Sequence, residues 1–61
     1  MKFVLELDMT SAAFKENPVA ELGRVLRYWG GNIGHYEMAP GSGEVIYDSN
    51  YHEVGKWSIT S

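Results

Sequence analysis

One stretch of the chain decides the fold, and it is Asn17-Pro18-Val19-Ala20-Glu21-Leu22-Gly23-Arg24-Val25-Leu26-Arg27-Tyr28-Trp29-Gly30-Gly31-Asn32-Ile33. Asparagine favours the N-cap of a helix and proline suits its first position, where no backbone N–H is needed, so we expect a helix to begin at Pro18. Apolar residues then recur at spacings of three and four, as on the buried face of a helix. They are Val19, Leu22, Leu26, Trp29 and Ile33, with Val25 widening the stripe.

The sequence leaves the end of this helix open. Gly30 and Gly31 would each cost about 1 kcal/mol inside a helix, and each is suited to end one. Ile33 nevertheless keeps the apolar spacing. We therefore expect helix from Pro18 to at least Trp29, with both a stop at Gly30 and a continuation to Ile33 remaining open.

The segment before this helix has the pattern of a strand followed by a helical turn. Residues 2–7 carry apolar side chains at alternate positions, which share one face of a strand. Residues 11–14 can form one helical turn, capped by Thr10 or Ser11. Phe14 is expected to anchor this turn on the core.

The segment after the helix predicts a hairpin. Residues 44–48 and 54–60 are rich in residues that favour strands, and the polar residues between them offer turn chemistry. Trp57 and Ile59 share a face and are expected to cover the helix. Alternation does not decide whether Ile46 or the pair Val45 and Tyr47 faces inward.

These elements predict an α+β fold with a single domain over residues 1–61. The order is β-α-β-β, with one main helix packed on a three-stranded, mostly antiparallel sheet whose strand order stays open. The composition, 44% apolar and 21% charged, is that of a globular chain. The expected core includes Leu26 and four aromatic side chains: Phe3, Phe14, Trp29 and Trp57.

Several classes of site are not expected. The chain has no cysteine, so it can form neither a disulfide nor a thiolate site. The glycines around Ser42 match neither a nucleophile elbow nor a phosphate-binding loop. His35 and His52 lie beside acids but are too few for a metal site. We expect a non-enzymatic protein without cofactor or metal, and the lack of a long apolar stretch predicts a soluble, cytoplasmic protein that does not enter a membrane.

The charge of the chain is unevenly distributed. The net charge is −3, and residues 1–27 are neutral, so all of it lies after Arg27. A chain of this sign is repelled by phosphate backbones, which argues against direct nucleic-acid binding and favours a basic protein partner. The acids of this segment are Glu37, Glu44, Asp48 and Glu53, against the single base Lys56.

The four tyrosines, Tyr28, Tyr36, Tyr47 and Tyr51, are too many for the core of so small a domain. Exposed tyrosines beside carboxylates are typical of protein interfaces. The residues predicted to bind a partner are Glu37, Glu44, Asp48, Glu53, Tyr47 and Tyr51.

Specific residues also suggest a relationship. They are the opening Met1-Lys2-Phe3-Val4-Leu5-Glu6-Leu7-Asp8, then Ala12-Ala13-Phe14, Pro18, Glu21 and Arg24-Val25-Leu26, and in the hairpin Ile46, Asp48, Asn50, Val54, Gly55 and Trp57. In these positions the chain resembles a family of small proteins encoded by bacteriophages and prophages, mostly without assigned function. It departs from the family pattern at Tyr51 and His52, where the family has a glycine and an asparagine, and in the glycine-rich segments 30–32 and 40–43.

The resemblance implies no catalytic residue. It implies an inhibitor of host defence, such as an anti-CRISPR protein, which would bind the basic, nucleic-acid-binding surface of a host protein such as a subunit of a CRISPR interference complex. Two alternatives stay open. The chain could be an accessory or structural phage protein that acts by self-association, so that either a monomer or a homodimer is possible, or a nucleic-acid binder that uses Arg24, Arg27 and Tyr28.

Overall fold

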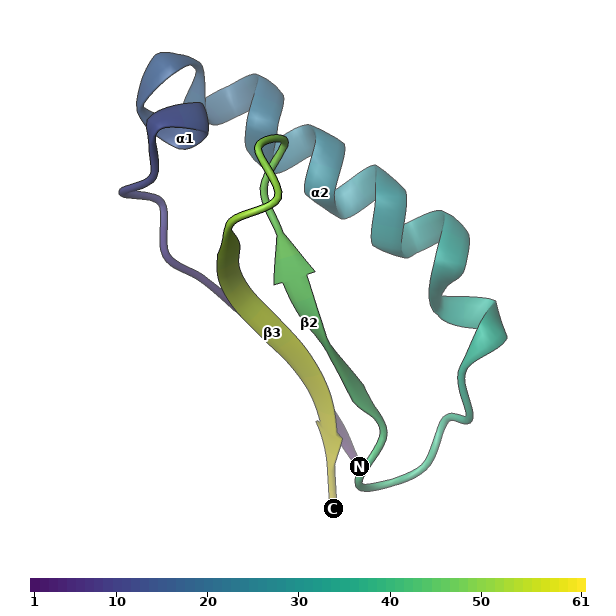
Figure 1. Cartoon of the computed structure of the whole chain (residues 1–61). Helices are drawn as coiled ribbons and strands as arrows, with labels where there is room; N and C mark the ends of the chain where they lie inside the picture. Colours follow the sequence, from purple (N-terminus) through teal and green to yellow (C-terminus); the bar gives the residue numbers. More distant parts are fainter.

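The computed structural model describes all 61 residues. Its elements, in chain order, are β1 (Lys2–Leu7), α1 (Ala12–Glu16), α2 (Pro18–Asn32), the short 3-10 helix η1 (Ile33–His35), β2 (Gly43–Tyr47) and β3 (Glu53–Thr60) (Figure 1). The three strands form one antiparallel sheet in the order β1-β3-β2. The predicted α+β fold and its order of elements are confirmed.

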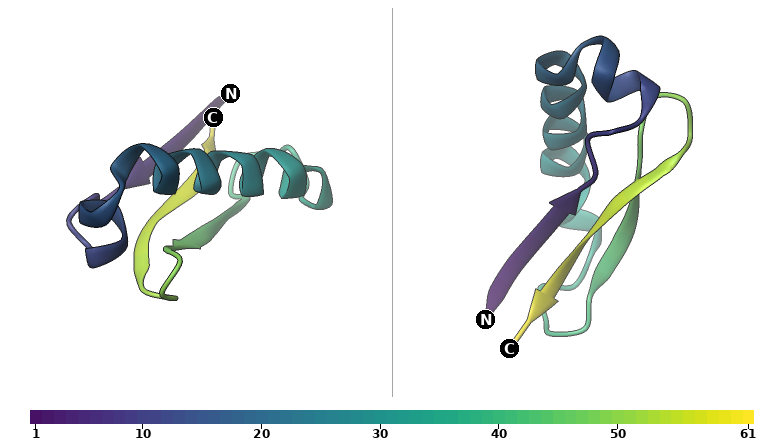
Figure 2. Two further views of the ribbon diagram at one scale, coloured as in Figure 1. Left: turned by 90° about the horizontal axis from the view of Figure 1, so that it is seen from above. Right: turned by 90° about the vertical axis from the view of Figure 1, so that its left-hand side faces the viewer.

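The sheet is covered on one side only. Helix α2 crosses one face of the sheet, and α1 lies at the N-terminal end of α2 (Figure 2). The last strand, β3, lies between the other two, so that Lys2 is opposite Thr60 and both ends of the chain lie together. The two edges of the sheet are therefore β1 and β2.

Helix α2 begins where the sequence predicts and runs through both glycines. The side chain of Asn17 accepts a hydrogen bond from the Ala20 N–H at 3.2 Å, and Pro18 occupies the first turn. The helix ends at Asn32, and the Ile33 N–H still donates to the Trp29 carbonyl. The continuation past Gly30 is thus the alternative that the structure adopts, because neither glycine takes a left-handed conformation.

Helix α1 forms over the expected residues, but its predicted cap is absent. Ser11 holds the N-cap position without a side-chain hydrogen bond to the backbone. The Thr10 hydroxyl and N–H donate instead to the carboxylate of Asp8, at 2.6 and 2.9 Å. These two bonds lower the pKa of Asp8, the side-chain bond contributing most.

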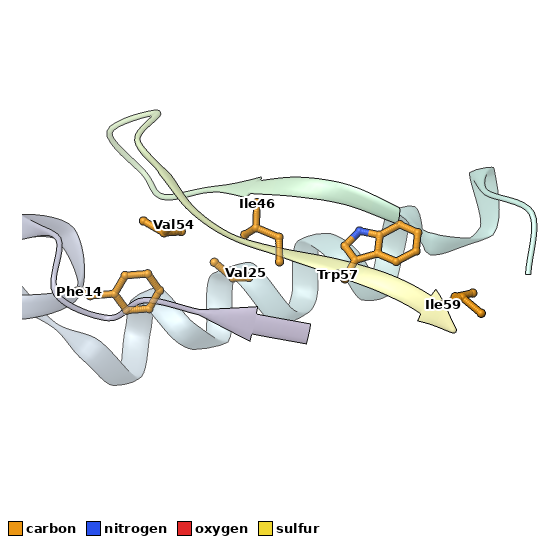
Figure 3. Close-up of a cluster of buried hydrophobic side chains, with 6 residues drawn as sticks. All are labelled: Phe14, Val25, Ile46, Val54, Trp57 and Ile59. Atoms are coloured by element: carbon orange, nitrogen blue, oxygen red, sulfur yellow. The ribbon is translucent and has the colours of Figure 1, made fainter. Parts of the chain in front are cut away.

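The core lies between α2 and the hairpin, with Phe14 at one end (Figure 3). Ile46 is fully buried, which settles the inward face of β2. A bulge lies beside it: Ile46 is opposite Gly55 and Tyr47 is opposite Glu53, so Val54 is the extra residue of β3. The core consists of Phe14, Val25, Ile46, Val54, Trp57 and Ile59.

The predicted apolar face of α2 is wrong at two residues, Val19 and Leu26. Leu26 is 50% exposed and Val19 is 83% exposed, whereas Val25 is 1% exposed. The buried line of α2 instead runs through Glu21 and Val25, which are four residues apart and therefore on one face. Helix α2 thus turns the face that carries Glu21 and Val25 toward the hairpin, where Glu21 is hydrogen-bonded to Ser49.

Phe3 is likewise not a core residue. It is 52% exposed and stacks on Trp57, with ring centroids 5.6 Å apart. Trp29 is half-buried against the core, and Trp57 is fully buried as predicted. The exposure of Phe3 follows from its place on an edge strand, near the end that α2 does not cover (Figure 2).

Replacing Gly30 by alanine should stabilise the protein. Gly30 is helical, and a Cβ there would meet no atom within 4 Å. Alanine should therefore raise the free energy of unfolding by about 0.5 to 1 kcal/mol, measured by thermal or urea denaturation. Gly55→Ala is the opposing control, because a Cβ there would collide with the Glu6 carbonyl and should unfold the chain. Destabilisation by Gly30→Ala would show that the helix ends at this residue.

The rotation of α2 can be tested with two neighbouring residues. Val25→Ala should cost about 2 kcal/mol or more, because it opens a cavity in the core. Leu26→Ala should cost less than about 1 kcal/mol, because half of the side chain is already in water. Urea denaturation of both variants measures the difference, and the reverse ranking would return Leu26 to the core.

Candidate partner-binding groove

A buried carboxylate joins α2 to the hairpin turn. Glu21 is 7% exposed and accepts hydrogen bonds from the Ser49 N–H at 2.7 Å and from the Ser49 hydroxyl. Arg24 donates to both oxygens of Glu21, at 3.2 and 3.3 Å, and also to the carbonyl of Tyr47 at 3.1 Å. Helix, turn and strand β2 are thus held by one network.

The same network lowers the pKa of Glu21. The bonds from the Arg24 side chain and the Ser49 hydroxyl contribute most, and they outweigh the burial that would raise it. Since these donors satisfy the ionised form, the folded state favours the carboxylate. The bond from Arg24 also means that its guanidinium is already paired.

Asp48 shapes the turn of the hairpin. It is 3% exposed, and its Oδ1 accepts from the N–H groups of Asn50 and His52, both at 2.9 Å. Its Oδ2 lies 3.8 Å from the His52 ring, and the Ser11 hydroxyl also helps to lower its pKa, after the larger effect of the His52 N–H. This carboxylate is therefore a structural group of the turn.

Tyr51 has an unusual backbone conformation in this turn. Its φ is 60°, the only positive value at a residue other than glycine. A tyrosine in this left-handed region is less stable than glycine by about 1 kcal/mol, because its Cβ crowds the next carbonyl. Its side chain is 87% exposed, so packing within the chain does not compensate.

A groove of about 540 Å³ lies between α2 and β2. Its walls are mainly aromatic, and Tyr36 and Trp29 lie against the core, with Tyr36 edge-on to Trp57 at 5.2 Å. Tyr28 packs edge-on against Trp29 at 5.2 Å. All four tyrosines of the chain line this groove, Tyr28, Tyr36, Tyr47 and Tyr51, together with Trp29, Arg24 and Glu44.

Glu44 supplies the free negative charge of the groove. Its carboxylate accepts a hydrogen bond from the Tyr36 hydroxyl at 3.2 Å but lies in no salt bridge, since Arg24 pairs with Glu21 and the His52 ring lies beside Asp48. Burial, followed by the charge of Glu44, raises the pKa of Tyr36. The groove thus combines aromatic rings with one carboxylate that lacks a cation.

The predicted binding residues do not form one surface. Glu44, Tyr47 and Tyr51 lie together in the groove. Glu53 lines a second, shallower hollow of about 380 Å³ with Glu6, Asp8 and Lys56, and Glu37 lies exposed in the loop before β2 and lines neither. Asp48 lines neither hollow, and its carboxylate is buried beneath the turn.

Sequence reasoning did not assign Tyr28, Trp29 and Tyr36 to the site. Tyr28 and Trp29 are neighbours near the end of α2, so a helix that continues past Gly30 brings both beside β2. Tyr36 follows η1, where the chain turns back toward the sheet. The apolar spacing that continues to Ile33 is the sequence feature that predicts a helix long enough to include Tyr28 and Trp29.

The pKa shift of Glu21 predicts how stability depends on pH. Since the folded state lowers this pKa, Glu21 stabilises the fold above its unfolded pKa of about 4.3, and this contribution is lost as the pH falls through the folded value. At neutral pH, Glu21→Gln should cost about 1 to 3 kcal/mol. Denaturation at several pH values should show that the difference in free energy of unfolding between wild type and Glu21→Gln shrinks below about pH 4.

Glu16→Gln is the matched control for that series, because Glu16 is exposed at the end of α1 and forms no side-chain hydrogen bond. Its stability should follow the wild type at every pH. A difference between Glu21→Gln and wild type that stays constant into acid would contradict the role of the Glu21 charge.

No three His, Asp or Glu side chains gather closely enough to hold a metal ion. None of its helices has the length and apolar character needed to cross a bilayer. In comparisons with known proteins, no family model, no curated protein and no solved structure matches this chain.

Proposed function

We propose that this protein is a non-enzymatic inhibitor that binds a basic, nucleic-acid-binding surface of a host protein through the groove between α2 and β2. The observation that carries the proposal is the gathering of all four tyrosines around Glu44 in this one groove. Tyrosine offers a large contact area at a small cost in side-chain entropy, which suits a surface made for binding.

The chemistry of the groove favours a cationic side chain as its occupant. A guanidinium or ammonium group attracts the faces of aromatic rings and pairs with a carboxylate. Glu44 has no cation of its own, while Arg24 is already paired with Glu21. An arginine or lysine of the partner would complete this arrangement, and the net charge of −3 would favour its approach.

Tyr51 supports the same function. This tyrosine keeps a backbone conformation that suits glycine better, and its side chain projects almost entirely into water at the rim of the groove. Strained residues of this kind concentrate at functional sites, where the side chain is worth its conformational cost. We assign Tyr51 to the contact with the partner.

The proposed biological setting is a phage-encoded protein acting in the cytoplasm of its bacterial host. The resemblance to small phage and prophage proteins supports this setting, and the acidic second half of the chain suits a partner whose surface normally binds nucleic acid. The proposed partner is a subunit of a CRISPR interference complex, and the protein would occupy the groove through which that subunit binds DNA.

Charge reversal at Glu44 should abolish this activity. The measurement is the plating efficiency of a targeted phage on hosts with different CRISPR systems, each expressing one variant. Wild type and Glu16→Lys should restore phage growth on one such host, whereas Glu44→Lys should not, although both substitutions change the net charge equally. With the purified complex, Glu44→Lys should weaken inhibition of DNA binding at least about tenfold, and added salt should weaken the wild type.

Tyr51→Gly separates binding from stability in the same assays. It should raise the melting temperature, because glycine relieves the left-handed backbone, yet it should weaken inhibition. Equal activity of wild type, Glu44→Lys and Tyr51→Gly, or no activity of the wild type against any interference complex, would refute the proposed function.

A further inference from the structure

Strand β1 is a free sheet edge that carries two charged side chains, Lys2 and Glu6, but has no bulge and no proline. Its six residues pair with β3 on one side only, in a continuous register. Natural edge strands are normally short, bulged or covered, because their free N–H and C=O groups can pair with another chain. Phe3 and Val4 are 52% and 38% exposed on this strand.

The opposite edge, β2, is protected in the ways that β1 is not. Its pairing with β3 is irregular, because Val54 of β3 bulges opposite Ile46 and Tyr47, and the carbonyl of Tyr47 already accepts a hydrogen bond from Arg24. The contrast within one sheet makes β1 the edge that is open to pairing with another strand.

The hydrogen bonding of β1 determines how such a partner can pair. The Asp8 N–H donates to the Val54 carbonyl, so the even-numbered residues of this register bond toward β3. The backbone groups of Phe3, Leu5 and Leu7 therefore point away from the sheet. They take part in no turn, loop or side-chain hydrogen bond of the chain.

A second copy of β1 can pair with this edge in registers that differ in the side chains placed opposite one another. In an antiparallel pair of identical strands, outward-facing residues must pair with one another, so the twofold axis passes through a residue and not between two. An axis at Val4 places Phe3 opposite Leu5 and Lys2 opposite Glu6 of the second copy. An axis at Leu5 would instead place Val4 opposite Glu6 and bring Asp8, outside the strand, opposite Lys2.

We propose that the protein forms a homodimer through antiparallel pairing of its two β1 strands about Val4. The charge pattern supports this register. It sets Lys2 of each copy opposite Glu6 of the other, and the opposite charges of these closely spaced side chains attract. Phe3 of each copy is covered by Leu5 of the other on the face that carries the helices. The product is a continuous six-stranded sheet.

The dimer does not depend on the proposed function, because the groove lies beside β2, at the other edge of each sheet. Both grooves stay open in the dimer. A monomeric chain that inhibits a host complex would refute the dimer alone, and a dimer without inhibitory activity would refute the proposed function alone.

The experiment uses two charge reversals, Lys2→Glu and Glu6→Lys, with the mass in solution measured by sedimentation equilibrium. Each variant alone places two like-charged pairs at the axis, and dimerisation should weaken at least about tenfold relative to wild type. An equimolar mixture of the two variants should recover the dimer, because one copy then carries two glutamates opposite two lysines. Circular dichroism and melting curves establish that each variant is folded.

Removal of one backbone donor tests the register without changing charge. In a synthetic chain, N-methylation of Phe3 blocks an outward N–H and should weaken dimerisation while leaving the fold intact, whereas N-methylation of Val4 removes a bond to β3 and should destabilise the fold. A monomeric wild type, unchanged dimerisation of Lys2→Glu or of the N-methyl-Phe3 chain, or a mixture that stays monomeric would overturn the proposal.

Discussion

The position of helix α2 depends on the buried carboxylate of Glu21. Its bonds to Ser49 fix the helix to the hairpin turn, and its bonds to Arg24 bring that guanidinium to the carbonyl of Tyr47. A buried charge is stable only when donors surround it, and here the donors come from the helix and from the turn. The same network therefore joins the helix to the turn and to the strand that borders the groove.

The sequence was sufficient for the elements and their order but not for the face of the helix. The Asn17-Pro18 start, the hairpin and the inward side chains of β3 follow from local chemistry and alternation, which act over a few residues. The choice between Val25 and Leu26 depends on a bond between Glu21 and Ser49, residues far apart in the chain. Apolar spacing cannot reveal that a glutamate lies at the centre of the buried face.

Some residues of the candidate site could likewise be predicted from the sequence, and others depend on tertiary packing. Tyr47, Tyr51 and Glu44 were identified because exposed tyrosines and acids in one segment suggest an interface. The burial of Asp48 could not be predicted from its residue type, because it depends on the bonds that its short side chain accepts from the N–H groups of its own turn. Tyr28 and Tyr36 join the groove only through the packing of α2 beside β2, a tertiary arrangement that composition and charge do not encode.

The central place of β3 also bears on how the chain folds. The hairpin of β2 and β3 needs only local contacts, but β1 must pair with a strand at the far end of the chain, and such distant contacts form slowly. During synthesis the first strand is made long before the strand that it pairs with. Its apolar side chains stay unpaired until residues 55 to 59 have emerged from the ribosome, so the sheet is completed only after translation has passed these residues.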